Sequence, residues 1–253
     1  MPLLVTDAVV LHAFDYLETS RILRLATREA GVQSVIARGA RRSRSRYGSA
    51  LDLFAGGIAE IHTKAGRELQ TLASFDVTHP RTHLALDLDR FTAASAISEL
   101  MLRFARDDAH DALFDALIAA LERVGDAAPG QATDAALAGA WHLVAELGFA
   151  PALDQCASCH AQLGDVEAVR FSHPAGGGLC ERCAPLVRAT RTLPADAIAV
   201  LRHWIAGQPG TLDGDGARRA HQRLLREFLQ EHLTDGRPLR AFDVWEREHW
   251  GAA

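Results

Sequence analysis

The sequence has no long apolar run, one lysine and only four cysteines in 253 residues. A membrane-spanning helix needs about 18 to 20 consecutive apolar residues, and no stretch approaches that length. The first seven residues lack the basic start and long apolar segment of a secretory signal peptide. We therefore expect a cytoplasmic protein with no membrane partner.

The scarcity of lysine excludes particular enzyme classes. Lys64 is followed by Ala65, whereas a nucleotide-binding P-loop requires a lysine directly followed by serine or threonine. The same scarcity disfavours a lysine Schiff-base enzyme. The sequence also lacks the serine-hydrolase elbow, the zinc-protease helix motif and a dinucleotide-binding loop. We predict that the protein is not an enzyme, with an undetected hydrolase or redox enzyme as the alternative.

The N-terminal third is rich in short apolar runs bounded by turn residues. Hydrophobic residues make up 48% of the chain and charged residues 23%, as in globular proteins, and the length allows two domains. Five β-strands are expected within residues 1–80. They span residues 5–14, 21–27, 32–37, 57–63 and 68–75. Five short strands without an intervening helix predict an antiparallel barrel of the OB-fold type.

From about residue 81 the apolar spacing changes to three and four residues, which is typical of amphipathic helices. We expect helices around residues 91–104, 113–121, 137–147, 198–205 and 224–233. The predicted class is thus α+β with two domains: a barrel over 1–80 and a helical domain over 81–253. Residues 151–192 interrupt the helical pattern and contain all four cysteines. They are expected to form an inserted module.

The cysteines form two C-x-x-C pairs separated by 20 residues. This spacing is at the upper edge of the range for a four-cysteine zinc site. Each pair can lie on a tight turn that directs two thiolates inward, and four thiolates leave no position for water. We therefore predict one structural Zn²⁺ bound by four ligands: Cys156, Cys159, Cys180 and Cys183.

Two other interpretations of the cysteines stay open, a redox dithiol and unligated packing residues. A thioredoxin-like dithiol would need a surrounding βαβ unit, which the sequence does not indicate. His160 and His173 could replace a cysteine as ligand or donate hydrogen bonds to one.

Charge is unevenly distributed. The net charge is −5, but residues 1–80 carry 10 basic and 8 acidic residues, whereas residues 81–155 carry 5 and 12. Any polyanion should therefore bind near the N-terminal end. Five arginines there lie within nine residues that contain no acid, so they are candidate nucleic-acid contacts: Arg38, Arg41, Arg42, Arg44 and Arg46.

The alternative for this arginine segment is a solvated loop with no role in binding. Aromatic side chains could add base stacking, as in other OB-folds. Tyr47 is the main candidate, ahead of Tyr16 and Phe54, although an aromatic residue in a small barrel is more often part of its core.

Taken in order along the chain, several short motifs resemble the bacterial DNA repair and recombination proteins of the RecO family. These are Asp7–His12, Asp15–Ser20, Arg38–Ser43 with Tyr47 and Gly48, Gly148 with Phe149, and the cysteine quartet. The individual motifs are weak, but their order covers essentially the whole chain.

The resemblance implies an N-terminal OB-fold, a helical body and a zinc module. It also implies a non-catalytic mediator that binds single- and double-stranded DNA and anneals complementary strands. Its implied partners are RecR, single-strand-binding protein and, indirectly, RecA, in the cytoplasm and at the nucleoid during repair. The alternative is a zinc-ribbon and OB-fold interaction module in RNA metabolism or transcription.

Overall fold

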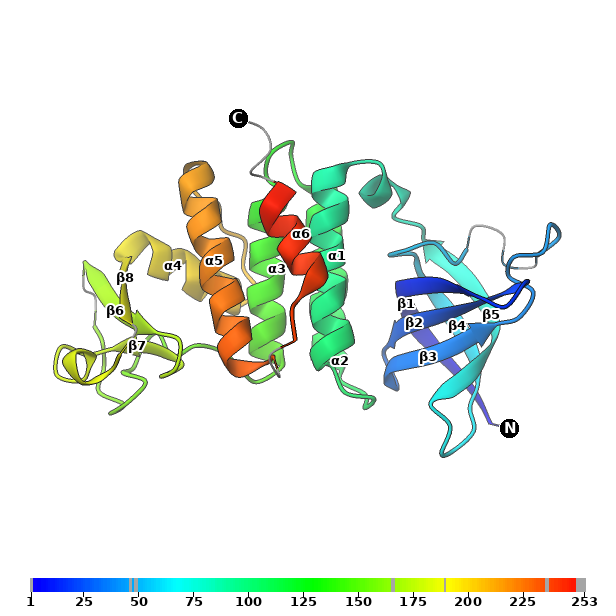
Figure 1. Ribbon diagram of the computed structural model, residues 1–253, viewed down its shortest axis with the longest axis horizontal. Coiled ribbons are helices and arrows are strands. Elements are labelled where there is room, and N and C mark those ends of the chain that lie inside the picture. The colour runs from blue at the N-terminus through cyan, green and yellow to red at the C-terminus, as the bar shows by residue number, and fades with distance from the viewer. Residues whose placement is uncertain are drawn as a thin grey trace. The chain divides into compact units, whose positions relative to one another are not determined.

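The computed structural model describes residues 2–45, 47, 50–164, 167–188, 190–234 and 237–248. The chain divides into two compact units, residues 1–126 and 127–253. The helices and strands of both units are labelled in Figure 1. Among the described residues, every helix is too short or too polar to cross a membrane.

The first unit begins with a closed five-stranded barrel in which the strand order is β1-β2-β3-β5-β4. This order confirms the predicted OB-like barrel. The strands are β1 (Leu3–Tyr16), β2 (Ser20–Thr27), β3 (Gly31–Ala37), β4 (Gly56–His62) and β5 (Leu69–His79). Closure pairs every strand on both sides, so the barrel has no free sheet edge.

One ladder of the barrel differs from the predicted antiparallel pattern. β3 and β5 pair in parallel through Ser34–Leu69, Val35–Gln70 and Ile36–Thr71. The chain leaves β3, crosses residues 38–55 and returns through β4 before β5 begins. A parallel pair requires a long crossover connection of this kind, and the remaining four ladders are antiparallel.

The barrel interior is filled by alternate side chains of the strands. Val10, Leu25, Val35 and Ile61 are at most 1% exposed and belong to one apolar cluster. Period-2 alternation directs such residues inward and their neighbours outward, which is why the apolar runs were recognisable as strands. Residues of the long β3–β4 connection complete this core: Tyr47, Leu51 and Ala55.

Two helices complete the first unit after the 3-10 helix η1 (Thr82–Ala85): α1 (Leu88–Phe104) and α2 (Asp111–Asp126). The Asp87 carboxylate caps α1 by accepting a hydrogen bond from the Arg90 N–H at 2.9 Å. The sequence placed both helices in a domain starting at residue 81. The barrel strands do end at His79, but the compact unit that contains them extends to Asp126.

Two arginines connect the barrel to α2. The buried Arg81 donates from Nε to Glu122 at 2.9 Å and from Nη1 to the Phe54 carbonyl at 3.0 Å. Arg28, at the end of β2, donates to Asp115 at 2.7 Å and lies 4.7 Å from the centre of the Phe114 ring. These contacts hold α2 against the barrel.

The second unit contains α3 (Ala132–Glu146), α4 (Ala195–Ile205), α5 (Gly214–His232) and α6 (Arg240–Glu248). A paired charge links α3 to α5, because Arg218 donates to both carboxylate oxygens of the buried Asp134, at 2.9 and 3.1 Å. Trp141 and Phe228 pack between the same helices with ring centres 5.3 Å apart.

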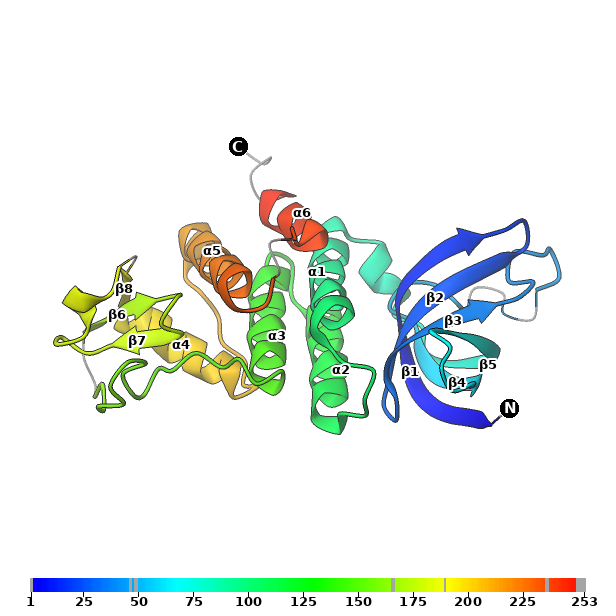
Figure 2. The same ribbon diagram turned by 60° about the horizontal axis from the view of Figure 1, so that its bottom comes forward.

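The predicted insert lies between α3 and α4 and contains a three-stranded sheet of order β7-β6-β8 (Figure 2). The elements are β6 (Ala168–Ser172), β7 (Gly177–Leu179), the 3-10 helix η2 (Ala184–Leu186) and β8 (Thr190–Pro194). Ser172 ends β6, and Gly177 and Gly178 begin β7. Three consecutive glycines concealed the short strand β7, since glycine is normally depleted in strands.

Candidate metal centre and nucleic-acid interface

The four cysteines converge in the second unit. Their four sulfur atoms all lie within 4.8 Å of one another, and Sγ of Cys159 is 3.7 Å from Sγ of Cys180. A tetrahedral Zn²⁺ with Zn–S bonds of about 2.3 Å separates its sulfurs by about 3.8 Å, so the spacing fits such an ion. Among the described residues this is the one cluster of metal-ligating side chains, and neither His160 nor His173 belongs to it.

Two tight turns bring the thiols together. In the first, the His160 N–H donates to the Cys156 carbonyl at 2.9 Å and the Cys156 N–H donates to the Ala161 carbonyl at 2.8 Å. In the second, the N–H groups of Cys183 and Ala184 both donate to the Cys180 carbonyl. Each turn therefore aims two sulfurs to one side, as the C-x-x-C spacing predicted.

The thiols influence one another's ionisation. Burial opposes ionisation of Cys156, but backbone hydrogen bonds from Cys180, Cys159 and Ser158 prevail and lower the pKa of its thiol to about 6. Hydrogen bonds with Cys159 and Cys180 raise the pKa of Cys183 to about 12. Thiols this close share protons, and a cation among them allows all four to ionise. The donor set therefore suits a thiophilic metal ion.

The cysteine module is attached to α5 through the sheet beside it. Phe171 on β6 is fully buried, with its ring centre 6.4 Å from that of Phe228. The ring Nε2 of His173 lies 3.1 Å from the Glu227 carboxylate, and the His232 ring bonds the His173 carbonyl at 2.7 Å. His173 thus serves the contact between sheet and helix and not the cysteine cluster.

Gly177 lies where the sheet meets the segment before the first cysteine pair. A Cβ built on Gly177 would come within 2.3 Å of the Ala152 carbonyl oxygen. We expect Gly177→Ala to push this segment away, lower the melting temperature by several degrees and speed metal loss to a chelator, since overpacking costs about 1 to 3 kcal/mol. Melting curves and metal-release rates measure both effects.

Gly216→Ala is the matched control for that substitution. Gly216 lies in α5, and a Cβ there would meet no atom within 4 Å. A helical glycine replaced by alanine is expected to be neutral or slightly stabilising. Wild-type metal retention in Gly177→Ala would contradict the tight approach of the two segments.

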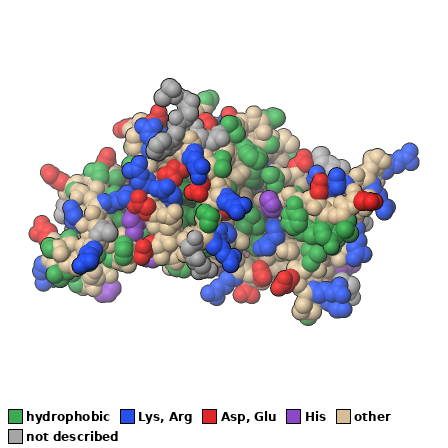
Figure 3. All heavy atoms as spheres, viewed as in Figure 1, with side chains coloured by type: hydrophobic (Ala, Val, Ile, Leu, Met, Phe, Trp, Pro, Cys, Tyr) green, Lys and Arg blue, Asp and Glu red, His purple; other side chains and the backbone are tan. Residues whose placement is uncertain are grey.

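The predicted arginine segment is exposed at one end of the barrel. Arg38, Arg41, Arg42 and Arg44 are all exposed, whereas Arg46 lies outside the described residues. Figure 3 shows basic side chains projecting from this end of the barrel. Arg41 is partly engaged: its Nε is 3.3 Å from Asp15. Within the described part of the chain, no acidic side chain pairs with the other three arginines.

The structure places Tyr47 in the barrel core. Its side chain is 4% exposed and its hydroxyl donates to the Leu72 carbonyl at 2.8 Å. Phe54 is likewise buried, at 1% exposure. These positions correct the stacking hypothesis for both residues, because neither ring has a free face. Tyr47 instead anchors the loop that carries the arginines.

An exposed aromatic row on β1 was largely missed from the sequence. The pairing of β1 with β2 shifts between Val10 and His12, which marks a β-bulge. The bulge reverses which side chains face outward, so His12, Phe14 and Tyr16 are exposed. Phe14 is opposite Ile22 on β2, which is in turn opposite Ile36 on β3. Arg41 donates to the carbonyls of Leu17 and Glu18, which places the arginine loop beside this row.

A closed OB-like barrel, an exposed basic loop and a four-cysteine module among helices define an OB-fold protein with a metal-binding module. The chain matches the model "Recombination protein O N terminal" over residues 1–81 and "Recombination protein O C terminal" over residues 85–241. The chain belongs to the recombination protein O family.

Individual relatives agree with this assignment. The chain is 40% identical to the DNA repair protein RecO of Anaeromyxobacter dehalogenans strain 2CP-C over 240 residues, which are 92% of each chain. It is 32% identical to the DNA repair protein RecO of Frankia casuarinae over 98% of this chain and 100% of the relative. A DNA repair protein RecO of a Nocardioides species is 31% identical over 91% of this chain and 94% of the relative. The chain is therefore a DNA repair protein of this family.

Proposed function

We propose that the chain is a recombination mediator that works by binding and not by catalysis. In this role it binds single- and double-stranded DNA and anneals complementary strands. With RecR it helps load RecA onto DNA coated by single-strand-binding protein, in the cytoplasm and at the nucleoid. Family membership supports this role, because the relatives are DNA repair proteins.

One observation carries the DNA-binding part of the proposal: a loop with three exposed arginines, with which no acidic side chain of the described residues pairs, is bonded through Arg41 to the turn that follows the exposed aromatic rings of β1. Guanidinium groups form paired hydrogen bonds with phosphate oxygens, and aromatic faces stack bases of any sequence. We assign the phosphate contacts to Arg38, Arg42 and Arg44, with Arg41 and Arg46 of the same segment. We assign base stacking to Phe14 and Tyr16, which are 44% and 40% exposed.

We further propose that the metal is one Zn²⁺ held by Cys156, Cys159, Cys180 and Cys183. Four thiolates fill a tetrahedral sphere, so the ion would act as a cross-link and would not activate water. In this arrangement residues 1–80 bind DNA, and the module at residues 151–192 stabilises the second unit without contacting DNA.

Strand annealing tests the mediator role. The protein is expected to accelerate annealing of two complementary oligonucleotides, followed by fluorescence energy transfer, by tenfold or more. The acceleration should persist when the strands are coated with single-strand-binding protein, and added RecR should shorten the lag of RecA filament assembly. A preference for RNA without DNA annealing would contradict the proposal and support an RNA-interaction module.

A further inference from the structure

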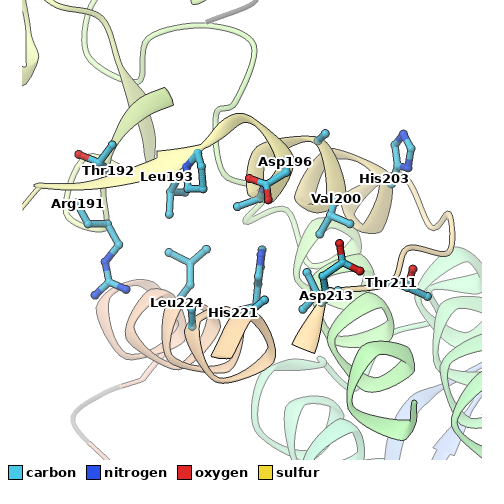
Figure 4. Close-up of a pocket in the computed structure, with 16 residues that line it drawn as sticks. Arg191, Thr192, Leu193, Asp196, Val200, His203, Thr211, Asp213, His221 and Leu224 are labelled. Carbon is cyan, nitrogen blue, oxygen red and sulfur yellow. The ribbon is translucent and has the colours of Figure 1, made fainter. Parts of the chain in front are cut away.

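The second unit contains a cavity of about 530 Å³ between β8, α4 and the first half of α5 (Figure 4). Binding pockets for small molecules typically enclose about 300 to 1,000 Å³, so this cavity has room for a bulky side chain. None of the four cysteines lines this cavity. It is therefore separate from both the metal cluster and the arginine loop.

The cavity floor is apolar. Leu193 from β8, Leu212 before α5 and Leu224 on α5 are each less than 10% exposed and line it. Ala217 and Ala220 face the same space from α5, and their small side chains leave it open. An apolar group entering the cavity would displace water from these surfaces, which is favourable.

One polar side chain, the buried His221, lies within the apolar floor. His221 is 4% exposed, lines the cavity and points into it from α5 in Figure 4. Its ring packs edge-on against Trp204 with 5.1 Å between ring centres, and its buried Nδ1 has no hydrogen-bond partner among the described residues. Burial lowers the pKa of His221 to about 4, so the ring is neutral at pH 7. A buried ring nitrogen without a partner is costly, and a ligand N–H would satisfy it.

The rim of the cavity is acidic. Asp196 at the start of α4 and Asp213 before α5 are exposed and line it. The Asp213 side chain forms no capping hydrogen bond at the start of α5. Arg191 is the cation of the lining, but it is already paired with Glu227. Asp196 accepts a hydrogen bond from the Ala197 N–H at 2.9 Å, but among the described residues no cationic side chain pairs with Asp196 or Asp213. The rim therefore carries net negative charge over an apolar floor.

We propose that this cavity, named here the α4–α5 pocket, binds a segment of a partner protein that carries a bulky apolar side chain next to a lysine or arginine. The apolar side chain fills the floor, an indole N–H suits the His221 ring, and the basic residue pairs with Asp196 or Asp213. The same carboxylates disfavour an acidic segment. The inference is independent of where DNA binds.

A short synthetic peptide, acetyl-Gly-Lys-Trp-Lys-Gly-amide, tests the proposal with the full-length metal-bound protein. Its binding should shift the ring signals of His221 in NMR spectra of histidine-labelled protein. The peptide with glutamate in place of both lysines should bind at least tenfold more weakly at low salt. The isosteric double variant Asp196→Asn/Asp213→Asn should lose most of that difference.

Two further variants test the location. Ala220→Trp fills the pocket and should abolish the His221 shifts, whereas Gln230→Trp, on α5 but outside the lining, should bind like the wild type. Wild-type binding by a folded Ala220→Trp protein would overturn the proposal. So would equal binding of the basic and acidic peptides, or binding of free tryptamine without binding of the basic peptide.

Discussion

Cys180→Ser is expected to release the metal ion and to destabilise the second unit. Losing one thiolate opens the closed coordination sphere, and a structural zinc contributes on the order of 10 kcal/mol in isolated fingers. We expect about one Zn²⁺ per chain in the wild type and less than a tenth of that in the variant. Elemental analysis measures the metal, and limited proteolysis should show cleavage within residues 151–192.

Ser158→Ala is the matched control, because Ser158 is an exposed residue between two ligands. It should retain full metal content and wild-type melting. The folded fraction of Cys180→Ser should bind single-stranded DNA within twofold of the wild type, since the arginines lie in the other unit. A folded, metal-free protein that has lost DNA binding would instead place DNA on the metal module.

The second large effect is expected from the triple substitution of Arg38, Arg42 and Arg44 by alanine. Each phosphate contact on a single strand contributes about 0.7 to the slope of log K against log salt, so the slope should become shallower by about 2. Over a fourfold rise in salt, the wild type should therefore lose roughly 20-fold more affinity than the variant. Fluorescence anisotropy with a labelled oligonucleotide measures both slopes.

Three arginines of the second unit provide a control of equal charge: Arg188, Arg219 and Arg223. Replacing them with alanine should change the slope by less than 0.5 if the contacts are local. An equal change in both triple variants would show that net charge, and not the barrel loop, determines binding. Arg41→Ala should have a smaller effect than Arg42→Ala, because Arg41 must first leave Asp15.

Features with short-range physical causes could be predicted from the sequence. The five barrel strands follow from apolar alternation, because one face of each strand lines the barrel interior and the other faces outward. The metal site follows from the C-x-x-C turns, whose geometry depends on a few adjacent residues. The long segment that separates the two pairs could vary in structure without altering the ligand set.

Features that depend on contacts between distant parts of the chain could not be predicted from the sequence. The shift between Val10 and His12 exposes Phe14 and Tyr16, and nothing local in the sequence marks it. Tyr47 could equally have faced solvent. Its burial depends on the loop folding back until the hydroxyl reaches Leu72, 25 residues further along the chain. Strand β7 is three residues long, and its extended conformation depends on its pairing with β6.

The two arginines that hold α2 to the barrel determine how the molecule can be divided. A fragment ending at residue 80 would lack Arg81 and Glu122, and it would leave Arg28 without Asp115. It would also uncover the barrel surface that α2 now shields from water. For dissection by truncation or by fusion, the piece to express is therefore residues 1–126, the compact unit in which the barrel keeps its own two-helix support.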